Sequence, residues 1–233
     1  MLESKEWKHI FKLDPEKEIS DENLELVCES GSDAIIVGGT FGVTFDNTID
    51  LLARIRRYAI PCFLEVSNIE AIVPGFDHYF IPLVLNATDA NWILQPHHEA
   101  IKELGSTIPW EHISTVGYTV LNPHSSVAEL TNASKNSSLE DVLAYGRMAQ
   151  HLLKLPFLYV EYSGAYGDVN MLKVCYQRLK REGDLHIFYG GGIRNREQAI
   201  EMSQVADTIV VGNIIYEDIQ LALSTIVKNK SNG

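Results

Sequence analysis

Two glycine-containing segments near the C-terminus have the composition of a phosphate-binding site. Gly190–Gly192 follows the apolar run Leu185–Tyr189, and Gly212-Asn213 follows the apolar run Thr208–Val211. Glycine leaves backbone N–H groups uncovered, and a helix that starts beside such a turn adds a dipole that favours an anion. A single glycine triplet could equally serve a tight turn. Two such turns after the last two apolar runs favour a phosphate monoester as the ligand.

An aspartate and a threonine follow two earlier apolar runs and have the chemistry of magnesium ligands. Asp14 comes after His9–Leu13, and Thr40 comes after Ala34–Val37. Proteins bind Mg²⁺ through one or two oxygens, while substrate phosphates and water complete the octahedron. The same two residues can also cap a turn or a helix. The sequence alone leaves both interpretations open.

A lysine lies inside the first apolar run. If the runs are barrel strands, the amine of Lys12 points into the lumen and needs an anion there. That anion is either a substrate phosphate or the carboxylate of Asp14 or Glu65, in a buried salt bridge.

A glutamate ends the sixth apolar run. Glu161 lies between Tyr159 and Tyr162 in the sequence, and a lumen carboxylate of suitable pKa can accept a proton from a hydroxyl group. We name Glu161 as the candidate general base, with Tyr159 or Tyr162 as its hydrogen-bond partner. The alternative is a paired carboxylate with a structural role.

Short β-rich runs that alternate with segments of helical periodicity must position these residues. This alternation is typical of βα units around a parallel sheet. There are eight runs: His9–Leu13, Ala34–Val37, Pro61–Val66, Tyr79–Leu85, Ile113–Leu121, Phe157–Glu161, Leu185–Tyr189 and Thr208–Val211. Eight strands in 233 residues predict one TIM (β/α)₈ barrel domain over residues 1–233. A flavodoxin-like open sheet is the alternative, but its first βα turn would hold a phosphate loop, and Asp14-Pro15-Glu16 is acidic.

Four expectations concern the segments between strands. Helices are expected at Thr48–Tyr58 and Glu217–Val227. A longer helix at Asn91–Leu104 should be bent or broken by Pro96. The polar stretch Asn122–Ser138 is expected to be a surface loop or partly mobile structure.

The composition indicates a globular protein without a nucleic-acid partner. Hydrophobic residues make up 45% of the chain and charged residues 21%, which excludes disorder and coiled coil. The formal net charge of −12 repels nucleic acid. Three widely spaced cysteines suggest a reducing compartment, and the N-terminus has no apolar signal segment. We expect a cytoplasmic location.

The segments at the strand ends also resemble those of a known family. They are Phe11–Pro15, Gly38–Thr40, Glu65–Ser67, Ile72–Asp77, Tyr159–Gly164, Tyr189–Ile193 and Val211–Asn213. In this order they resemble the PcrB branch of the geranylgeranylglyceryl phosphate synthase family, from Trp7 to about Leu223. The resemblance implies Mg²⁺-dependent transfer of a heptaprenyl group from heptaprenyl diphosphate to the C3 hydroxyl of sn-glycerol 1-phosphate, giving an ether and releasing diphosphate. It also implies a homodimer.

The resemblance assigns roles to individual positions. Asp14 and Thr40 would contact Mg²⁺. Glycerol phosphate would be bound by Lys12, Tyr159, Val160, Glu161, Tyr162, Ser163, Gly164, Gly192, Gly212 and Asn213. The small residue Ala100 would leave open a groove for a long prenyl chain.

Such a chain needs an apolar groove, whose candidate lining is Ile72, Val73, Phe76, Tyr79, Ile81, Val84, Trp92 and Ile93. Apolar residues on strands and helices more often belong to the core. His97-His98-Glu99 is interpreted as a solvated turn and not as a metal site, because consecutive helical histidines face different directions. Transient membrane contact is compatible with a prenyl substrate, although no basic amphipathic helix supports it.

Two other functions use the same phosphate site. A sugar-phosphate isomerase or lyase would be expected to show an Asp/Lys or Asp/Asp pair across the lumen. A non-catalytic sensor of a polyprenyl or phosphorylated metabolite would need no magnesium ligand.

Overall fold

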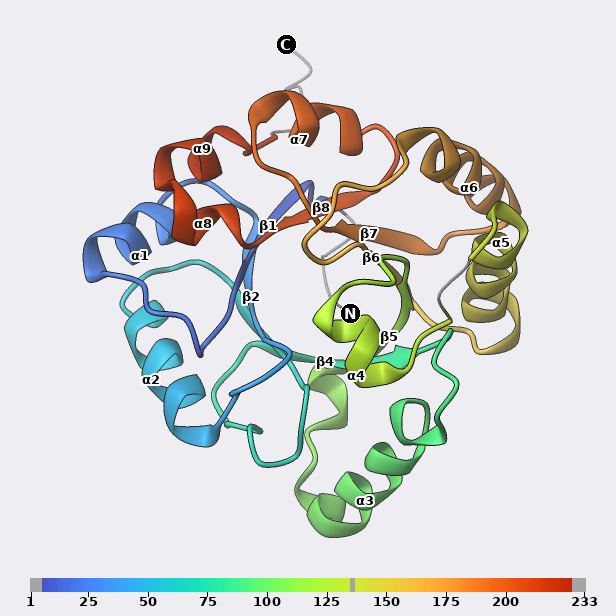
Figure 1. Cartoon of the computed structure of the whole chain (residues 1–233). Helices are drawn as coiled ribbons and strands as arrows, with labels where there is room; N and C mark the ends of the chain where they lie inside the picture. Colours follow the sequence, from blue (N-terminus) through green and yellow to red (C-terminus); the bar gives the residue numbers. More distant parts are fainter. Residues whose placement is uncertain (1–5, 135–136, 228–233) are drawn as a thin grey trace.

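The computed structural model describes residues 6–134 and 137–227, and its strands form a closed parallel barrel (Figure 1). The strands pair in chain order, and β8 closes the barrel against β1. Their bounds are β1 His9–Leu13, β2 Ala34–Val37, β3 Cys62–Glu65, β4 His78–Val84, β5 Ile113–Val120, β6 Phe157–Glu161, β7 His186–Gly190 and β8 Thr208–Val211. The predicted TIM barrel is confirmed. The single domain predicted for residues 1–233 extends past the described residues at both ends.

The two faces of the strands form two separate cores. Successive residues of a strand point to opposite faces, so Ile10 fills the lumen while Phe11 packs between the barrel and the helices. In the lumen, the ring centroid of Phe80 lies 5.6 Å from that of Phe157 and 6.1 Å from that of Phe188. Because these rings fill the lumen, its charged side chains are confined to the carboxyl ends of the strands.

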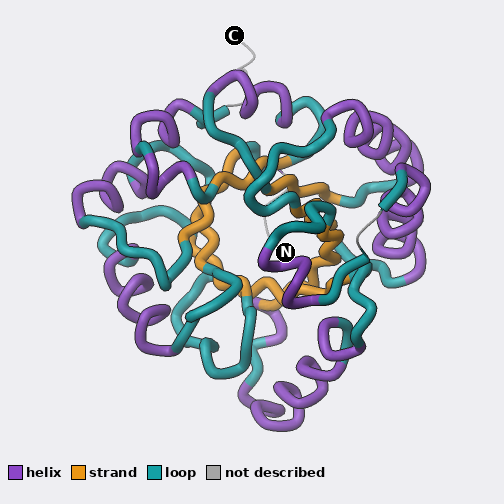
Figure 2. Tube along the Cα trace, viewed as in Figure 1, coloured by secondary structure: helices purple, strands orange, loops and turns teal. Residues whose placement is uncertain are grey.

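The helices surround the barrel (Figure 2). They are α1 Asp21–Cys28, α2 Phe45–Ile55, α3 Gln95–Leu104, α4 Ser126–Thr131, α5 Leu139–Arg147, α6 Val169–Glu182, α7 Arg196–Met202, α8 Ile214–Glu217 and α9 Ile219–Ser224. No helix joins β3 to β4, because residues 66–77 are a loop. Figure 1 shows α3 set outward from the barrel and α4 lying across its opening. None of the helices in the described ranges is long and apolar enough to cross a lipid bilayer.

Capping residues explain where two helices differ from the prediction. α2 begins at Phe45 because Thr44 and Asn47 form a capping box, in which each backbone N–H donates to the other side chain. The predicted helix Glu217–Val227 is wrong in its bounds, because extended backbone at Asp218 separates α8 from α9. The Asp218 carboxylate then accepts from two N–H groups of α9.

The helix expected at Asn91–Leu104 is broken and not bent: a 3₁₀ turn, Ala90–Trp92, precedes α3, and Pro96 lies in the first turn of α3, where its missing N–H is not needed. The expectation of a loop at Asn122–Ser138 was wrong in part. The polar stretch Asn122–Ser138 contains α4, which Ser125 caps by accepting a hydrogen bond from Ala128 N at 3.1 Å.

Candidate active site

A salt bridge occupies the lumen near the carboxyl ends of the strands. The Nζ of Lys12, on β1, lies 2.7 Å from Oε1 of Glu65, the last residue of β3. The other carboxylate oxygen of Glu65 accepts a hydrogen bond from the hydroxyl of Tyr118 on β5. Of the anions considered for Lys12, the structure contains the carboxylate of Glu65. Both oxygens of Glu65 are engaged, so this residue is suited to hold Lys12 in place.

The surroundings of Lys12 keep its amine charged. Burial alone lowers the pKa of Lys12, but the attraction of Glu65 and Glu161 outweighs it and the net shift is upward. The amine lies 5.7 Å from the ring centroid of Tyr159, which stacks on Tyr118 with centroids 4.6 Å apart. A positively charged donor is thus fixed at the mouth of the barrel, where it can meet an anionic substrate.

Glu161 is the second lumen carboxylate, and only 5% of its surface is exposed. Its Oε1 accepts hydrogen bonds from the backbone N and the Oγ of Ser163, at 2.7 and 3.0 Å. Burial raises the pKa of Glu161, against the opposing attraction of Lys12. The prediction that a tyrosine is its hydrogen-bond partner was wrong: Ser163 fills that role. A buried carboxylate with a raised pKa is suited to accept a proton.

The other side chains of this segment point in different directions. Tyr162 leaves the lumen and packs on Tyr189, with ring centroids 6.1 Å apart. Val160 packs in the core between the barrel and the helices, so its side chain does not face the lumen. Tyr159 is buried in the lumen with its hydroxyl against Gly190. Within this predicted binding segment, Tyr159 and Glu161 therefore face the lumen, and the Ser163 hydroxyl joins them through its hydrogen bond to Glu161.

The two glycine turns lie side by side at the rim, because β7 and β8 are paired. Gly192 has a φ of +62°, and a Cβ there would collide with the backbone of Ala165, so only glycine fits. Gly212 has ordinary backbone, and the nearest atom to a Cβ there would be the carbonyl oxygen of Lys12 at 3.4 Å. In the described part of the chain, the N–H groups of Gly192 and Gly212 have no hydrogen-bond acceptor. They are available to an anion.

Two residues that the sequence analysis missed support this rim. The Nζ of Lys17 donates to Oδ1 of Asn213 at 3.0 Å, which places a second cation at the last glycine turn. The hydroxyl of Tyr216, on α8, accepts from the N–H of Asp14 at 2.8 Å. It thereby ties α8 to the loop after β1. Neither contact follows from the spacing of residues along the chain.

Asp14 and Thr40 fit a magnesium site. The carboxylate of Asp14 packs directly on Gly39, where a Cβ would collide with it, and Thr40 is the next residue. Burial raises the pKa of Asp14, against the opposing effect of the Glu16 N–H and of Lys17, and a bound cation would favour its charged form further. Among the described residues, no group of three or more His, Cys, Asp or Glu side chains could hold a metal. Two protein oxygens suit an ion that keeps waters and substrate phosphates as ligands.

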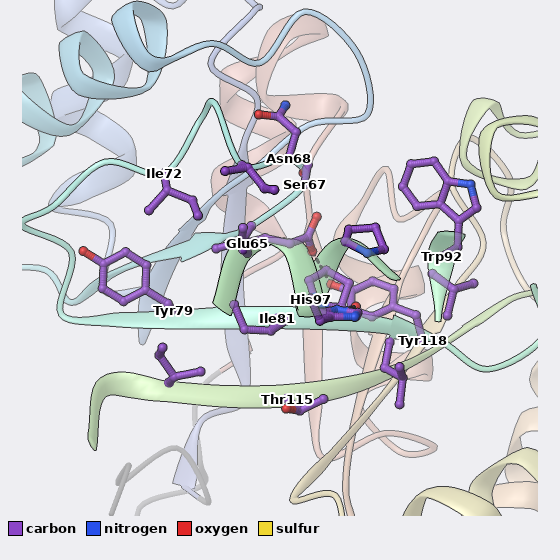
Figure 3. A pocket seen from close by; sticks show the side chains of 18 of the residues that line it. Glu65, Ser67, Asn68, Ile72, Tyr79, Ile81, Trp92, His97, Thr115 and Tyr118 are labelled. Atoms are coloured by element: carbon purple, nitrogen blue, oxygen red, sulfur yellow. Dashed lines mark hydrogen bonds between the residues drawn. The ribbon is translucent and has the colours of Figure 1, made fainter. Parts of the chain in front are cut away.

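An apolar cavity of about 760 Å³ opens beside these charged groups (Figure 3). Lys12, Thr40 and Glu161 line one end, and Ala100 lines the wall formed by α3. Five of the apolar residues expected in a groove also line it: Ile72, Tyr79, Ile81, Val84 and Trp92. Of the other three, Val73 and Phe76 belong to the core and the partly buried Ile93 packs against it. The glycine turns and Asp14 lie outside the cavity lining, at its polar end.

The interpretation of His97 as part of a solvated turn was wrong. His97 belongs to α3 and lines the cavity, whereas His98 is exposed. The Nε2 of His97 donates to the carbonyl oxygen of Pro82 at 2.9 Å. Its Nδ1 is buried and has no hydrogen-bond partner among the described residues. Sequence periodicity could not reveal this contact, because it depends on how α3 lies against β4.

Comparisons with known proteins agree with this geometry. The sequence model of the PcrB family matches residues 2–230. A heptaprenylglyceryl phosphate synthase of Bacillus cereus (strain AH187) is 57% identical over 220 residues, which are 94% of this chain and 95% of that protein. A heptaprenylglyceryl phosphate synthase of Anoxybacillus flavithermus (strain DSM 21510 / WK1) is 56% identical over 233 residues, 99% of this chain and 100% of that protein.

A solved structure is similar in fold. It is the (S)-3-O-geranylgeranylglyceryl phosphate synthase of Thermoplasma acidophilum in complex with sn-glycerol-1-phosphate. The TM-score is 0.79 at 24% sequence identity, and the similarity covers 94% of this chain and 93% of that one. This similarity supports the barrel architecture.

Proposed function

The chain belongs to the PcrB family, and from this premise we propose that it transfers a heptaprenyl group from heptaprenyl diphosphate to the C3 hydroxyl of sn-glycerol 1-phosphate. The products are the ether heptaprenylglyceryl phosphate and diphosphate. One observation supports this proposal independently of the relatives: an apolar cavity of about 760 Å³ begins at Lys12 and Glu161. A long apolar chain and a charged acceptor can therefore meet at one point.

The acceptor is held by its phosphate. The unpaired N–H groups of Gly192 and Gly212, the ammonium of Lys12 and the nearby Lys17 together offer the charge and the donors that a phosphate monoester needs. Holding the phosphate presents the C3 hydroxyl at the end of the cavity, which replaces a bimolecular encounter by a positioned reaction.

Glu161 accepts the proton of the C3 hydroxyl. One of its carboxylate oxygens is fixed by Ser163, and the other has no hydrogen bond among the described residues. As the hydroxyl oxygen bonds to the allylic carbon, the carbon–oxygen bond to diphosphate breaks and its electron pair leaves with the diphosphate. Glu65 holds Lys12 and does not take part in this proton transfer, because both of its oxygens are already engaged.

We propose Asp14 and Thr40 as the protein ligands of Mg²⁺. When bound, the ion offsets the negative charge that develops on the departing diphosphate. The half-buried carboxylate of Asp14 and its contact with Gly39 support this assignment. The hydroxyl of Tyr216, on α8, accepts a hydrogen bond from the N–H of Asp14 and so holds the backbone of Asp14 in position.

The prenyl chain lies in the apolar cavity along α3, where Ala100 leaves room for it. The remaining expectations, a homodimer, a cytoplasmic location and transient membrane contact, stay predictions.

One assay tests the proposal. The protein is incubated with sn-glycerol 1-phosphate and prenyl diphosphates, with and without Mg²⁺, and the lipid products are identified by mass spectrometry. We expect an ether product only with Mg²⁺. Isomerisation or cleavage of sugar phosphates in a parallel incubation would support the first alternative, and binding of prenyl diphosphate without turnover would support a sensor. Ether formation in the presence of EDTA would overturn the magnesium assignment alone.

A further inference from the structure

The barrel wall is incomplete between β3 and β4 at their carboxyl ends. β3 pairs with β4 only as far as Glu65 and Phe80, and the last hydrogen bond of this edge runs from Val66 N to the carbonyl of Phe80 at 2.9 Å. β4 nevertheless continues to Val84 along β5. Residues 81–84 thus have a strand partner on one side only.

A proline and a histidine satisfy this open edge at residue 82. Backbone groups of a strand alternate between its two neighbours, so Pro82 turns the same way as Phe80, toward the missing partner. Proline has no N–H group and leaves no unpaired donor there. Its carbonyl oxygen accepts a hydrogen bond from His97 Nε2 at 2.9 Å. His97 therefore supplies the partner that a continued β3 would have supplied.

The apolar cavity passes through this gap. Its lining includes Tyr118 and Val84, which belong to the lumen face, and Tyr79 and Leu83, which belong to the outer face of the same wall. A chain that starts at the polar mouth can leave the lumen here and continue along α3. Figure 3 shows His97 and Ile81 together with Tyr118 around this passage.

α3 forms the far wall of the passage and is weakly held by packing. None of its residues is buried. The hydrogen bond from His97 to Pro82 ties this helix directly to β4. Ala100 lies three residues after His97, on the same face of the helix. The position of the His97 ring therefore fixes the distance between the Ala100 wall and the barrel.

We propose that His97 is a positioning residue, which holds α3 against the open edge of β4 and so sets the width of the passage for a long prenyl chain. The inference rests on the proposed function, because it assumes that the prenyl diphosphate occupies the cavity. A donor shorter than the passage depends less on this wall, since its chain ends before α3.

Three variants test this role. His97→Leu removes the donor, His97→Gln keeps an N–H donor near the position of Nε2, and His98→Leu is the matched control at the exposed neighbouring residue. We expect His97→Leu to raise the KM for heptaprenyl diphosphate about fivefold, the effect of losing one hydrogen bond. The KM for farnesyl diphosphate, the KM for sn-glycerol 1-phosphate and kcat should stay near the wild-type values. His97→Gln should restore the KM, and His98→Leu should leave it unchanged.

Binding measured without turnover separates this inference from the proposed reaction. Trp92 and Trp110 line the cavity, so the fluorescence of these tryptophans reports heptaprenyl diphosphate in the absence of the acceptor. If the wild-type protein binds this donor but makes no ether, the proposed reaction fails while the comparison of variants still tests His97. Equal losses for long and short donors, an unchanged KM in His97→Leu, or a failure of His97→Gln to restore it would overturn the positioning role. Thermal unfolding curves show whether each variant is folded.

Discussion

The two sides of the barrel mouth are built in opposite ways. On the side of β6 to β8, the loops rest directly on one another: Gly192 leaves no space for a Cβ beside Ala165, and Ser163 holds Glu161 by two hydrogen bonds. On the side of β3 and β4, no helix joins the strands, and the helix that follows β4 has no buried residue. A rigid backbone suits the small acceptor, which is the same in every turnover. A loosely held wall suits a flexible prenyl chain. Substitutions in this wall can change the chain length that the protein prefers without disturbing the acceptor.

Glu161→Gln tests the point where the two sides meet and has the largest expected effect. Removing the proton acceptor should lower kcat by about 10²–10⁴-fold. The KM for sn-glycerol 1-phosphate should change little, because the phosphate is held by other groups. Steady-state kinetics with both substrates measure this. Near-normal turnover with intact acceptor affinity would assign the base to another residue.

Gly192→Ala tests the rigid side. The Cβ would meet the backbone of Ala165 at a positive φ, so we expect a loss of about 1–3 kcal/mol in the free energy of unfolding. The KM for sn-glycerol 1-phosphate should rise at least about tenfold, since the rim turn must shift. Gly212→Ala is the matched control, because space for its Cβ is available within the protein. We expect Gly212→Ala to keep the thermal stability and still raise this KM. An unchanged KM in both variants would place the phosphate elsewhere.

Ala100→Trp tests the open side. The indole would fill the cavity beside α3, so the ratio of kcat/KM for heptaprenyl over farnesyl diphosphate should fall about tenfold. Glu99→Trp places the same side chain on an exposed position of the helix and should leave the ratio unchanged. Product lengths from a mixture of prenyl diphosphates measure the preference directly. The same length profile in Ala100→Trp and the wild type would mean that the chain does not pass α3.

Ser163→Ala should have the smallest effect, and its direction is informative. Burial raises the pKa of Glu161, and the hydrogen bonds from Ser163 work to lower it. Since a base must be deprotonated, kcat/KM should fall as the pH decreases through this raised pKa. Removing the Ser163 hydroxyl raises the pKa further and should move the acidic limb of the profile to higher pH, so the loss in kcat/KM should be confined to that limb. A shift toward lower pH would contradict the assignment.

The barrel could be predicted because its signals are local. Each strand is a short apolar run, and the residues at or just after its end mark the barrel rim, so Asp14, Thr40 and Glu161 could be placed at the mouth from the sequence alone. Four of the strands begin and end at the predicted residues. Helix bounds were less accurate, because a cap such as Thr44 or a break such as Asp218 outweighs the apolar pattern.

The contacts between elements could not be predicted in this way. The bond from His97 to Pro82 and the contact of Tyr216 with Asp14 join residues that only the packed barrel brings together. Tyr118 was within reach of sequence reasoning, since it alternates with Val116 and Val120 on the lumen face. Its bond to Glu65 was not, because it depends on the register of two strands that are not neighbours.

The tie between Tyr216 and Asp14 has a consequence for synthesis of the chain. Asp14 leaves the ribosome early, and its partner follows 202 residues later. At about 5–20 residues per second, that interval is roughly 10–40 s. During this time the first strand has no eighth strand beside it and the aspartate is not yet fixed. Nascent chains released before Tyr216 should therefore be inactive even when most of the barrel has been translated.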